Sequence, residues 1–211
     1  ETFFVKHGVP ATFVGHYLLE DIKAAYLSSP IPGRGQIALL PGSRHQEIDR
    51  MLRTRMVAAN AHVKKYGGRA VVAAVRGAYD YENVIPRGVG DNTEIVYDDS
   101  RRVIFESDVV VAASGTATLE TGIIARPLVI VYKTGAITYQ IARRVITLDK
   151  IGLVNLVLGS KVAPELIQGQ ASPRAIAGEI SRYQEDCDYR DRVHQQLLQV
   201  PSKLGGVGAS D

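Results

Sequence analysis

Five short apolar runs divide this chain, and a helix-like or loop segment separates each run from the next. The runs cover residues 37–40, 70–75, 94–97, 109–113 and 128–131. Runs of this length that are rich in β-branched residues are typical of strands buried on both faces. The alternation predicts an α/β fold with a doubly wound, Rossmann-like parallel sheet, whose ligands bind at the carboxyl ends of the strands.

The clearest helix follows the first of these runs. Its apolar positions recur at steps of three and four residues, as expected for a helix with one face against a sheet: Ile48, Leu52, Met56, Ala59 and Val63. We expect Ser43 to cap its N-terminus and Glu47 to lie near the position of a capping-box acid. Gly67 and Gly68 end the helix.

The order of these elements divides the chain into three parts. Residues 1–35 are expected to form a linker with a leading strand at 11–14 and a short helix at 18–26, and residues 36–170 a Rossmann-like domain. Residues 171–211 are expected to form terminal helices, which begin with Ser172 as N-cap and Pro173 in the first turn.

Composition narrows the classes of protein and of site. The 211 residues carry a formal net charge of +3, a single cysteine and five histidines, none of them at zinc-like spacing. We expect no internal disulfide, no metal, no nucleic-acid partner and a reducing, cytoplasmic location. No apolar run is long enough for a membrane span, and the first residues lack the layout of a signal peptide.

An apolar helix predicted at 138–148 carries the pair Arg143 and Arg144. Such a pair is usually a solvated helix face. Contact with an acidic membrane lipid surface is the functional alternative.

The first candidate site is the turn Ser114–Gly115–Thr116, which follows the strand at 109–113 and opens a helix. Free backbone N–H groups at a helix N-terminus bind anions. Glu120 lies about one turn into this helix, where its carboxylate can meet hydroxyl groups of the same ligand. A phosphate group together with a polyol indicates a nucleotide.

A second turn of the same kind follows the strand at 37–40 and contains Gly42, Ser43 and Arg44. One interpretation is a capped helix beside an exposed arginine. The alternative is that Arg44 pairs bidentately with a diphosphate, and the matching turn at Ser114 favours this alternative.

Several motifs, in order along the chain, resemble those of the lipid-A-disaccharide synthase family. They cover residues 13–16, 39–44 with 47–48, 114–120, 129–133 with 138–139, 155–156 and 164–168. The family consists of bacterial inverting glycosyltransferases of the two-domain GT-B type. The resemblance implies that this chain is the carboxyl-terminal, UDP-sugar-binding half, and that residues 36–170 are its nucleotide-sugar-binding domain. One departure is Val154, where the family tends to have a proline before the asparagine.

The resemblance also implies a reaction and a set of contacts. The enzyme would transfer 2,3-diacylglucosamine from UDP to 2,3-diacylglucosamine 1-phosphate, without a cofactor or metal. Arg44 and the Ser114 turn would hold the diphosphate, Glu120 the ribose, and Asn155 and Gln168 the sugar or a phosphate. The general base and the acceptor site would belong to the amino-terminal domain, so we expect the 211-residue chain alone to be inactive and its terminal helices to be truncated.

Two other classes of function share these features. Another UDP-sugar enzyme of GT-B architecture, such as a 2-epimerase or an N-acetylglucosaminyltransferase, would have the same sheet and the same acidic ribose contact. A stand-alone nucleotide-binding module would lack an acceptor domain. Product analysis with acylated and non-acylated UDP-glucosamine separates the enzymes.

Overall fold

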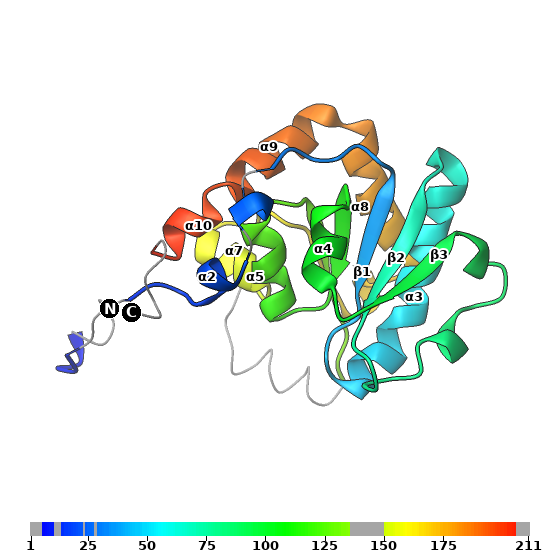
Figure 1. Cartoon of the computed structure of the whole chain (residues 1–211), viewed down its shortest axis with the longest axis horizontal. Coiled ribbons are helices and arrows are strands. Elements are labelled where there is room, and N and C mark those ends of the chain that lie inside the picture. The colour runs from blue at the N-terminus through cyan, green and yellow to red at the C-terminus, as the bar shows by residue number, and fades with distance from the viewer. Residues whose placement is uncertain (1–5, 11–13, 23, 28, 136–149, 206–211) are drawn as a thin grey trace.

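The computed structural model describes residues 6–10, 14–22, 24–27, 29–135 and 150–205. One six-stranded parallel sheet has the order β3-β2-β1-β4-β5-β6. The strands are β1 (Gln36–Leu40), β2 (Arg69–Ala74), β3 (Thr93–Tyr97), β4 (Val109–Ala112), β5 (Leu128–Tyr132) and β6 (Glu165–Ile167). Figure 1 shows β1, β2 and β3 side by side at one edge of this sheet. The predicted doubly wound α/β fold is confirmed, and the strand order reverses between β1 and β4.

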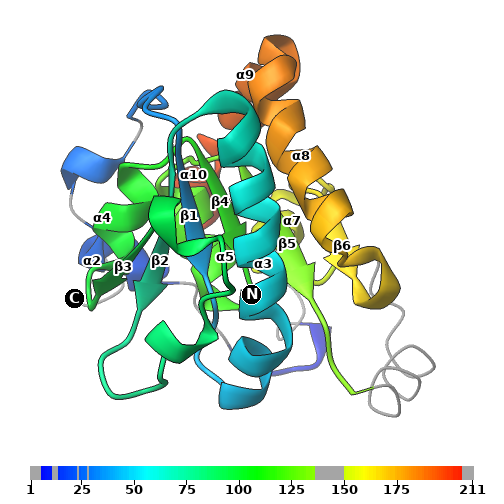
Figure 2. The same cartoon turned by 90° about the vertical axis from the view of Figure 1, so that its right-hand side faces the viewer.

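Helices cover both faces of the sheet. The helices are α2 (Leu18–Asp21), α3 (His45–Tyr66), α4 (Ser100–Phe105), α5 (Thr116–Ile123), α7 (Leu153–Leu158), α8 (Pro173–Glu185), α9 (Cys187–Leu197) and α10 (Val200–Lys203). Short 3-10 turns lie at Ala24–Tyr26, Glu82–Val84, Gly90–Asn92 and Gln168–Gln170. Figure 2 shows α3 and α8 in front of the sheet and α4 and α5 behind it.

The central strands are buried on both faces, which explains their continuous apolar sequences. Every residue of β1 and β4 is buried, and Leu39, Val110 and Val111 have no exposed surface. Strands between two helical layers have no polar face to alternate with, so the pattern of the sequence is unbroken. This packing fixes the positions of the loops at the carboxyl edge of the sheet.

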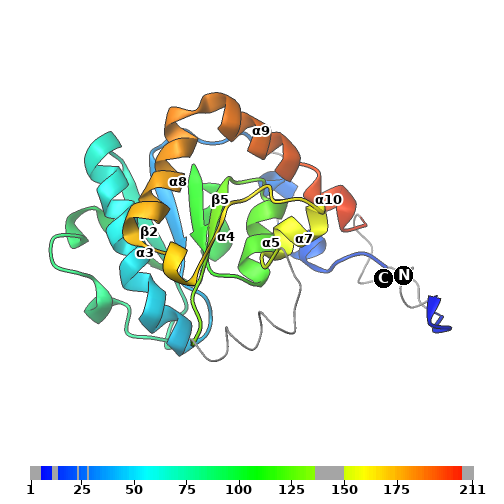
Figure 3. The ribbon, with the colours of Figure 1, turned by 180° about the vertical axis from the view of Figure 1, so that it is seen from behind.

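The terminal helices belong to the same core. Ile176, Ile180 and Tyr183 of α8 are buried, and the Tyr183 hydroxyl donates to the Leu128 carbonyl at 3.1 Å. Figure 3 shows α8, α9 and α10 following one another in an arc from α3 to α5 and α7. The start of α8 is as predicted, because Ser172 Oγ accepts from Ala175 N and Pro173 lies in the first turn.

The start of α3 differs from the prediction. Its N-cap is Arg44, not Ser43, and no side chain caps it. The chain turns at Gly42 with φ of +96°, so Ser43 still belongs to the connection and the Arg44 carbonyl accepts the first helical bonds, from the N–H groups of Glu47 and Ile48. The Glu47 carboxylate binds the Arg44 guanidinium, so the capping-box prediction was wrong.

Other predicted elements also need correction. The helix expected at 18–26 is divided into α2 and the 3-10 turn Ala24–Tyr26. β6 and α7, which form in the segment that contains Asn155 and Gln168, are not predicted from the sequence. The strand expected at 11–14 lies mostly outside the described residues, and the helix at 138–148 with Arg143 and Arg144 lies entirely outside them.

Candidate functional site

A cleft of about 380 Å³ lies at the carboxyl ends of β1, β2 and β4, where the strand order reverses. Seven residues predicted from sequence line it: Gly42, Ser43, Arg44, Ser114, Gly115, Thr116 and Glu120. Six of them lie at two turns more than 60 residues apart in the sequence, and Glu120 lies on α5. The reversal point of a doubly wound sheet is the usual ligand site of this fold.

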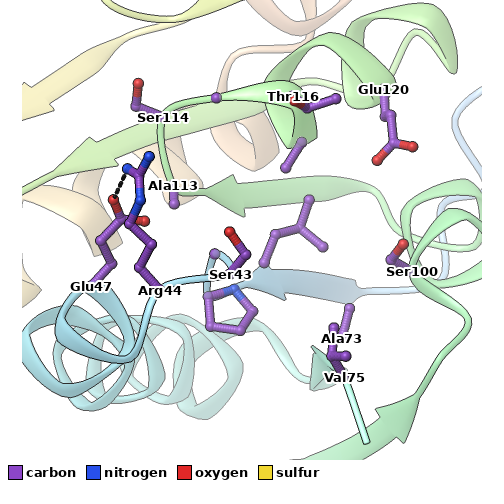
Figure 4. A pocket seen from close by; sticks show the side chains of 15 residues that line it. Ser43, Arg44, Glu47, Ala73, Val75, Ser100, Ala113, Ser114, Thr116 and Glu120 are labelled. Carbon is purple, nitrogen blue, oxygen red and sulfur yellow. Dashed lines mark hydrogen bonds and ion pairs between the residues drawn. The ribbon is translucent and has the colours of Figure 1, made fainter. Parts of the chain in front are cut away.

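Three helices start at the edge of this cleft. Arg44 precedes α3, Thr116 begins α5 and Ser100 begins α4, and all three residues line the cleft (Figure 4). The first N–H groups of a helix have no partner within the helix, and the helix dipole adds partial positive charge there. The cleft therefore offers backbone donors to an anion from more than one direction.

The Ser114–Thr116 turn depends on a glycine. Gly115 has φ of +122° and ψ of −159°, a conformation that other residues rarely adopt. A Cβ on Gly115 would meet no atom within 4 Å, so the backbone conformation, and not the lack of space, is what requires glycine. The Ser114 hydroxyl donates to the Ile151 carbonyl at 3.2 Å, which fixes the turn against the segment before α7.

Space as well as conformation requires glycine in the first turn. A Cβ on Gly42 would lie 2.9 Å from Glu47 Oε2 and 3.2 Å from the Ala113 Cβ. The backbone of the β1–α3 connection therefore passes close to both α3 and the end of β4. This close approach keeps the two turns on either side of one narrow cleft.

Arg44 is the exposed cation of the cleft. Its side chain is 78% exposed, and Nη1 donates to Glu47 Oε1 at 3.0 Å. Figure 4 shows this pair beside the turn that carries Ser114. A guanidinium has five N–H donors in a planar fork, so Arg44 has donors left for a phosphate group.

Glu120 occupies the far end of the cleft, on α5 (Figure 4). Its side chain is 17% exposed, and Oε1 accepts from Arg101 Nε at 3.1 Å. Arg101 also donates through Nη1 to the Asp21 carbonyl at 2.8 Å. The carboxylate is therefore paired with a cation while it borders the cleft.

A second arginine lies beneath the same edge of the sheet. Arg55 of α3 is buried, and it donates to the carbonyls of Leu40 at 3.0 Å and Val131 at 3.1 Å. Burial lowers the pKa of Arg55 to about 10, and the nearby charge of Glu47 opposes that shift. Arg55 thus remains a cation at neutral pH and adds positive charge at the ends of β1 and β5.

Two predicted site residues do not line the cleft. Asn155 has no exposed surface; its amide donates to Ala163 O and Glu165 Oε1 at 2.8 Å, and its oxygen accepts from Val162 N and Ala163 N. Gln168 has φ of +52°, and its amide donates to the Thr134 carbonyl at 3.2 Å.

Asn155 instead belongs to a polar network behind the cleft. The Glu165 carboxylate that accepts from Asn155 also accepts from the N–H groups of Ile151 and Gly152. The Ile151 carbonyl in turn accepts from the Ser114 hydroxyl. Asn155 therefore helps to place the segment that supports Ser114.

Three residues at or beside the cleft were missed as site residues. The sequence indicates only a capping role for Glu47, and after the strand at 94–97 it indicates only a short helix that starts at Ser100. Ser100 follows a predicted strand as Ser43 and Ser114 do, so this strand–turn–helix pattern was the available signal. Arg101 carried no such signal, because its contact with Glu120 joins residues 19 positions apart.

Within the ranges of residues that the structure describes, no group of three His, Cys, Asp or Glu side chains is placed to hold a metal ion. No helix within the same ranges has the length and apolar character needed to cross a membrane.

Comparison with known sequences decides the family. Residues 1–204 match the family described as lipid-A-disaccharide synthetase. The chain belongs to this family. Its relatives include the lipid-A-disaccharide synthases of Trichlorobacter lovleyi, 34% identical over 98% of this chain, and of Anaeromyxobacter dehalogenans, 35% identical over 99%. The chain spans a little over half the length of these relatives, 56% and 57%.

Solved structures confirm the fold. The calicheamicin glycosyltransferase CalG4 matches with a TM-score of 0.57 and 19% identity, over 88% of this chain and 42% of that one. A protein described as a putative UDP-N-acetylglucosamine 2-epimerase from Listeria monocytogenes matches with a TM-score of 0.55 and 12% identity, over 92% and 44%. At these identities, the two matches show only that the chain shares their Rossmann-like fold. The family match, together with relatives at 34% and 35% identity, confirms the predicted resemblance and does not favour the alternative of an epimerase.

Proposed function

We propose that this chain is the donor-binding half of a GT-B glycosyltransferase, a lipid-A-disaccharide synthase. The observation that carries the proposal is the cleft at the strand-order reversal, where the two glycine-containing turns, Arg44 and Glu120 come together. Family membership supports the same reading.

In this proposal the cleft holds UDP. The diphosphate accepts hydrogen bonds from the N-terminal amides of α3 and α5 and from the free donors of Arg44. Glu120 accepts hydrogen bonds from the ribose hydroxyls. These cationic and dipolar groups stabilise the diphosphate directly, so binding requires neither a metal nor another cofactor.

The proposed reaction transfers 2,3-diacylglucosamine from UDP to 2,3-diacylglucosamine 1-phosphate. Negative charge builds on the leaving diphosphate as the bond to the anomeric carbon breaks. Helix N-termini and Arg44 stabilise that charge more than they stabilise the bound donor, and this difference accelerates the step. A second, amino-terminal domain supplies the acceptor site and the general base.

Asn155 and Gln168 have separate places in the proposal. Asn155 acts through the network that supports Ser114, and Gln168, next to the end of β5, faces the donor sugar. Since donor and acceptor both carry acyl chains, the complete enzyme works at a membrane surface. In this proposal the surface is the cytoplasmic face of an acidic membrane.

Product analysis on the full-length protein that contains this chain tests the proposal. We expect disaccharide from acylated UDP-glucosamine and none from the non-acylated donor. Arg44→Ala should lower kcat/KM by about 100-fold or more, because a donor to the developing charge is lost. Arg53→Ala, an exposed position on the same helix, is the matched control and should keep wild-type activity. Epimerised UDP-sugar as the product, or equal use of both donors, would refute the assignment.

A further inference from the structure

The carboxylate of Glu120 is held from one side only. Oε1 accepts from Arg101 Nε at 3.1 Å, and the two side chains are 17% and 31% exposed. Within the residues that the structure describes, Oε2 of Glu120 has no hydrogen bond, and this atom is not buried. One carboxylate oxygen is therefore fixed, while the other is available to a ligand in the cleft.

Arg101 is itself held on its opposite edge by Asp21. Nη1 donates to the Asp21 carbonyl at 2.8 Å, and Nη2 lies 3.5 Å from Asp21 Oδ2. Asp21 ends α2, whose Leu18 and Leu19 are 2% and 4% exposed. The guanidinium thus bridges a helix anchored in the core and the carboxylate at the cleft.

We propose that Arg101 is a positioning residue that aims Glu120 at the ribose hydroxyls and so determines selectivity for ribonucleotides. The inference rests on the proposed function, which places the ribose at Glu120. A glutamate held in advance loses less rotamer freedom when the ligand binds. The planar fork of an arginine fixes two partners at once, whereas a lysine keeps the charge without this geometry.

Titration calorimetry with UDP and 2′,3′-dideoxy-UDP measures this effect. We expect the wild-type chain to bind UDP more tightly than 2′,3′-dideoxy-UDP, and Arg101→Gln to lower the ratio of the two affinities at least fivefold. The affinity for 2′,3′-dideoxy-UDP should stay within twofold of wild type. Arg101→Lys should give an intermediate ratio.

Arg102→Gln is the matched control. Arg102 is the next residue of α4, but it pairs with Asp99 and Glu106 and does not line the cleft. This variant should keep the wild-type ratio, and melting temperatures should show that each variant is folded.

The outcomes separate this inference from the proposed function. If wild type does not discriminate between the two nucleotides, or Glu120→Ala leaves the ratio unchanged, the ribose assignment fails. If Glu120→Ala abolishes discrimination but Arg101→Gln keeps the ratio, or weakens both ligands equally, the role of Arg101 is overturned. Should Arg101→Gln unfold, a wild-type ratio in Arg101→Lys overturns it.

Discussion

At the scale of single residues, the cleft depends on two glycines and on charged side chains that form ion pairs. Seven of the residues predicted from sequence line this cleft, because a glycine-containing turn after a buried strand indicates both a location and a chemistry. Asn155 could not be placed in the same way. Its partners Ala163 and Glu165 lie eight and ten positions further on, and the strand that begins at Glu165 is too short to show a pattern.

Gly115→Ala tests whether the backbone of the Ser114 turn matters for binding. An alanine would meet no atom, but it would have to adopt φ of +122°, at a cost of about 1–3 kcal/mol. We expect a lower melting temperature and an affinity for UDP reduced about fivefold or more, equivalent to about 1 kcal/mol.

Gly159→Ala is the control for this substitution. Gly159 caps α7 in the left-handed region, with φ of +73° and open space around it, and it does not line the cleft. The control should lose some stability and keep its affinity for UDP. Equal affinities for Gly115→Ala and wild type would show that the turn does not contact the ligand.

At the scale of elements, the long apolar runs and the 22-residue helix α3 were predictable, and the short pieces were not. β6 has three residues, all half-buried, at the edge of the sheet, so it shows neither a continuous apolar run nor an alternation. It forms because Glu165, Leu166 and Ile167 pair with β5. The predicted start of α3 was wrong by one residue because the turn at Gly42 delays the helix. This turn brings the Gly42 backbone so close to Ala113 and Glu47 that a Cβ would not fit, and the sequence does not show such a close approach.

The link between α3 and two strands gives a prediction at this scale. Arg55 donates to the last residue of β1 and to Val131 of β5, although β4 separates these strands. Arg55→Met keeps the apolar packing but removes the two hydrogen bonds that tie α3 to these strands, while the Leu40 carbonyl keeps its bond from Ala113 N. The loss should lower the free energy of unfolding by about 1–3 kcal/mol.

Urea unfolding of Arg55→Met and Arg53→Met measures the difference. Arg53 is exposed two residues earlier on the same helix, and its loss should change stability by less than about 0.5 kcal/mol. Similar stabilities for the two variants would mean that Arg55 does not join the strands.

At the scale of the whole molecule, the topology brings the candidate site together. The chain runs from β1 outward to β3 and then returns to β4 beside β1, so the turns after β1 and β4 open side by side. Parallel β strands with their carboxyl ends at one edge made this convergence predictable from the order of the elements. The contribution of Arg101 and Asp21 was not, since their contact joins residues 80 positions apart in the sequence.

The most direct test is a calorimetric titration of UDP into this chain, with and without EDTA. We expect one binding site for UDP, with an affinity that EDTA does not change. Arg44→Ala and Glu120→Ala should each weaken that affinity at least tenfold, about 1.4 kcal/mol. Arg53→Ala should bind as wild type does. No binding of UDP, or unchanged affinity in both cleft variants, would contradict the central claim.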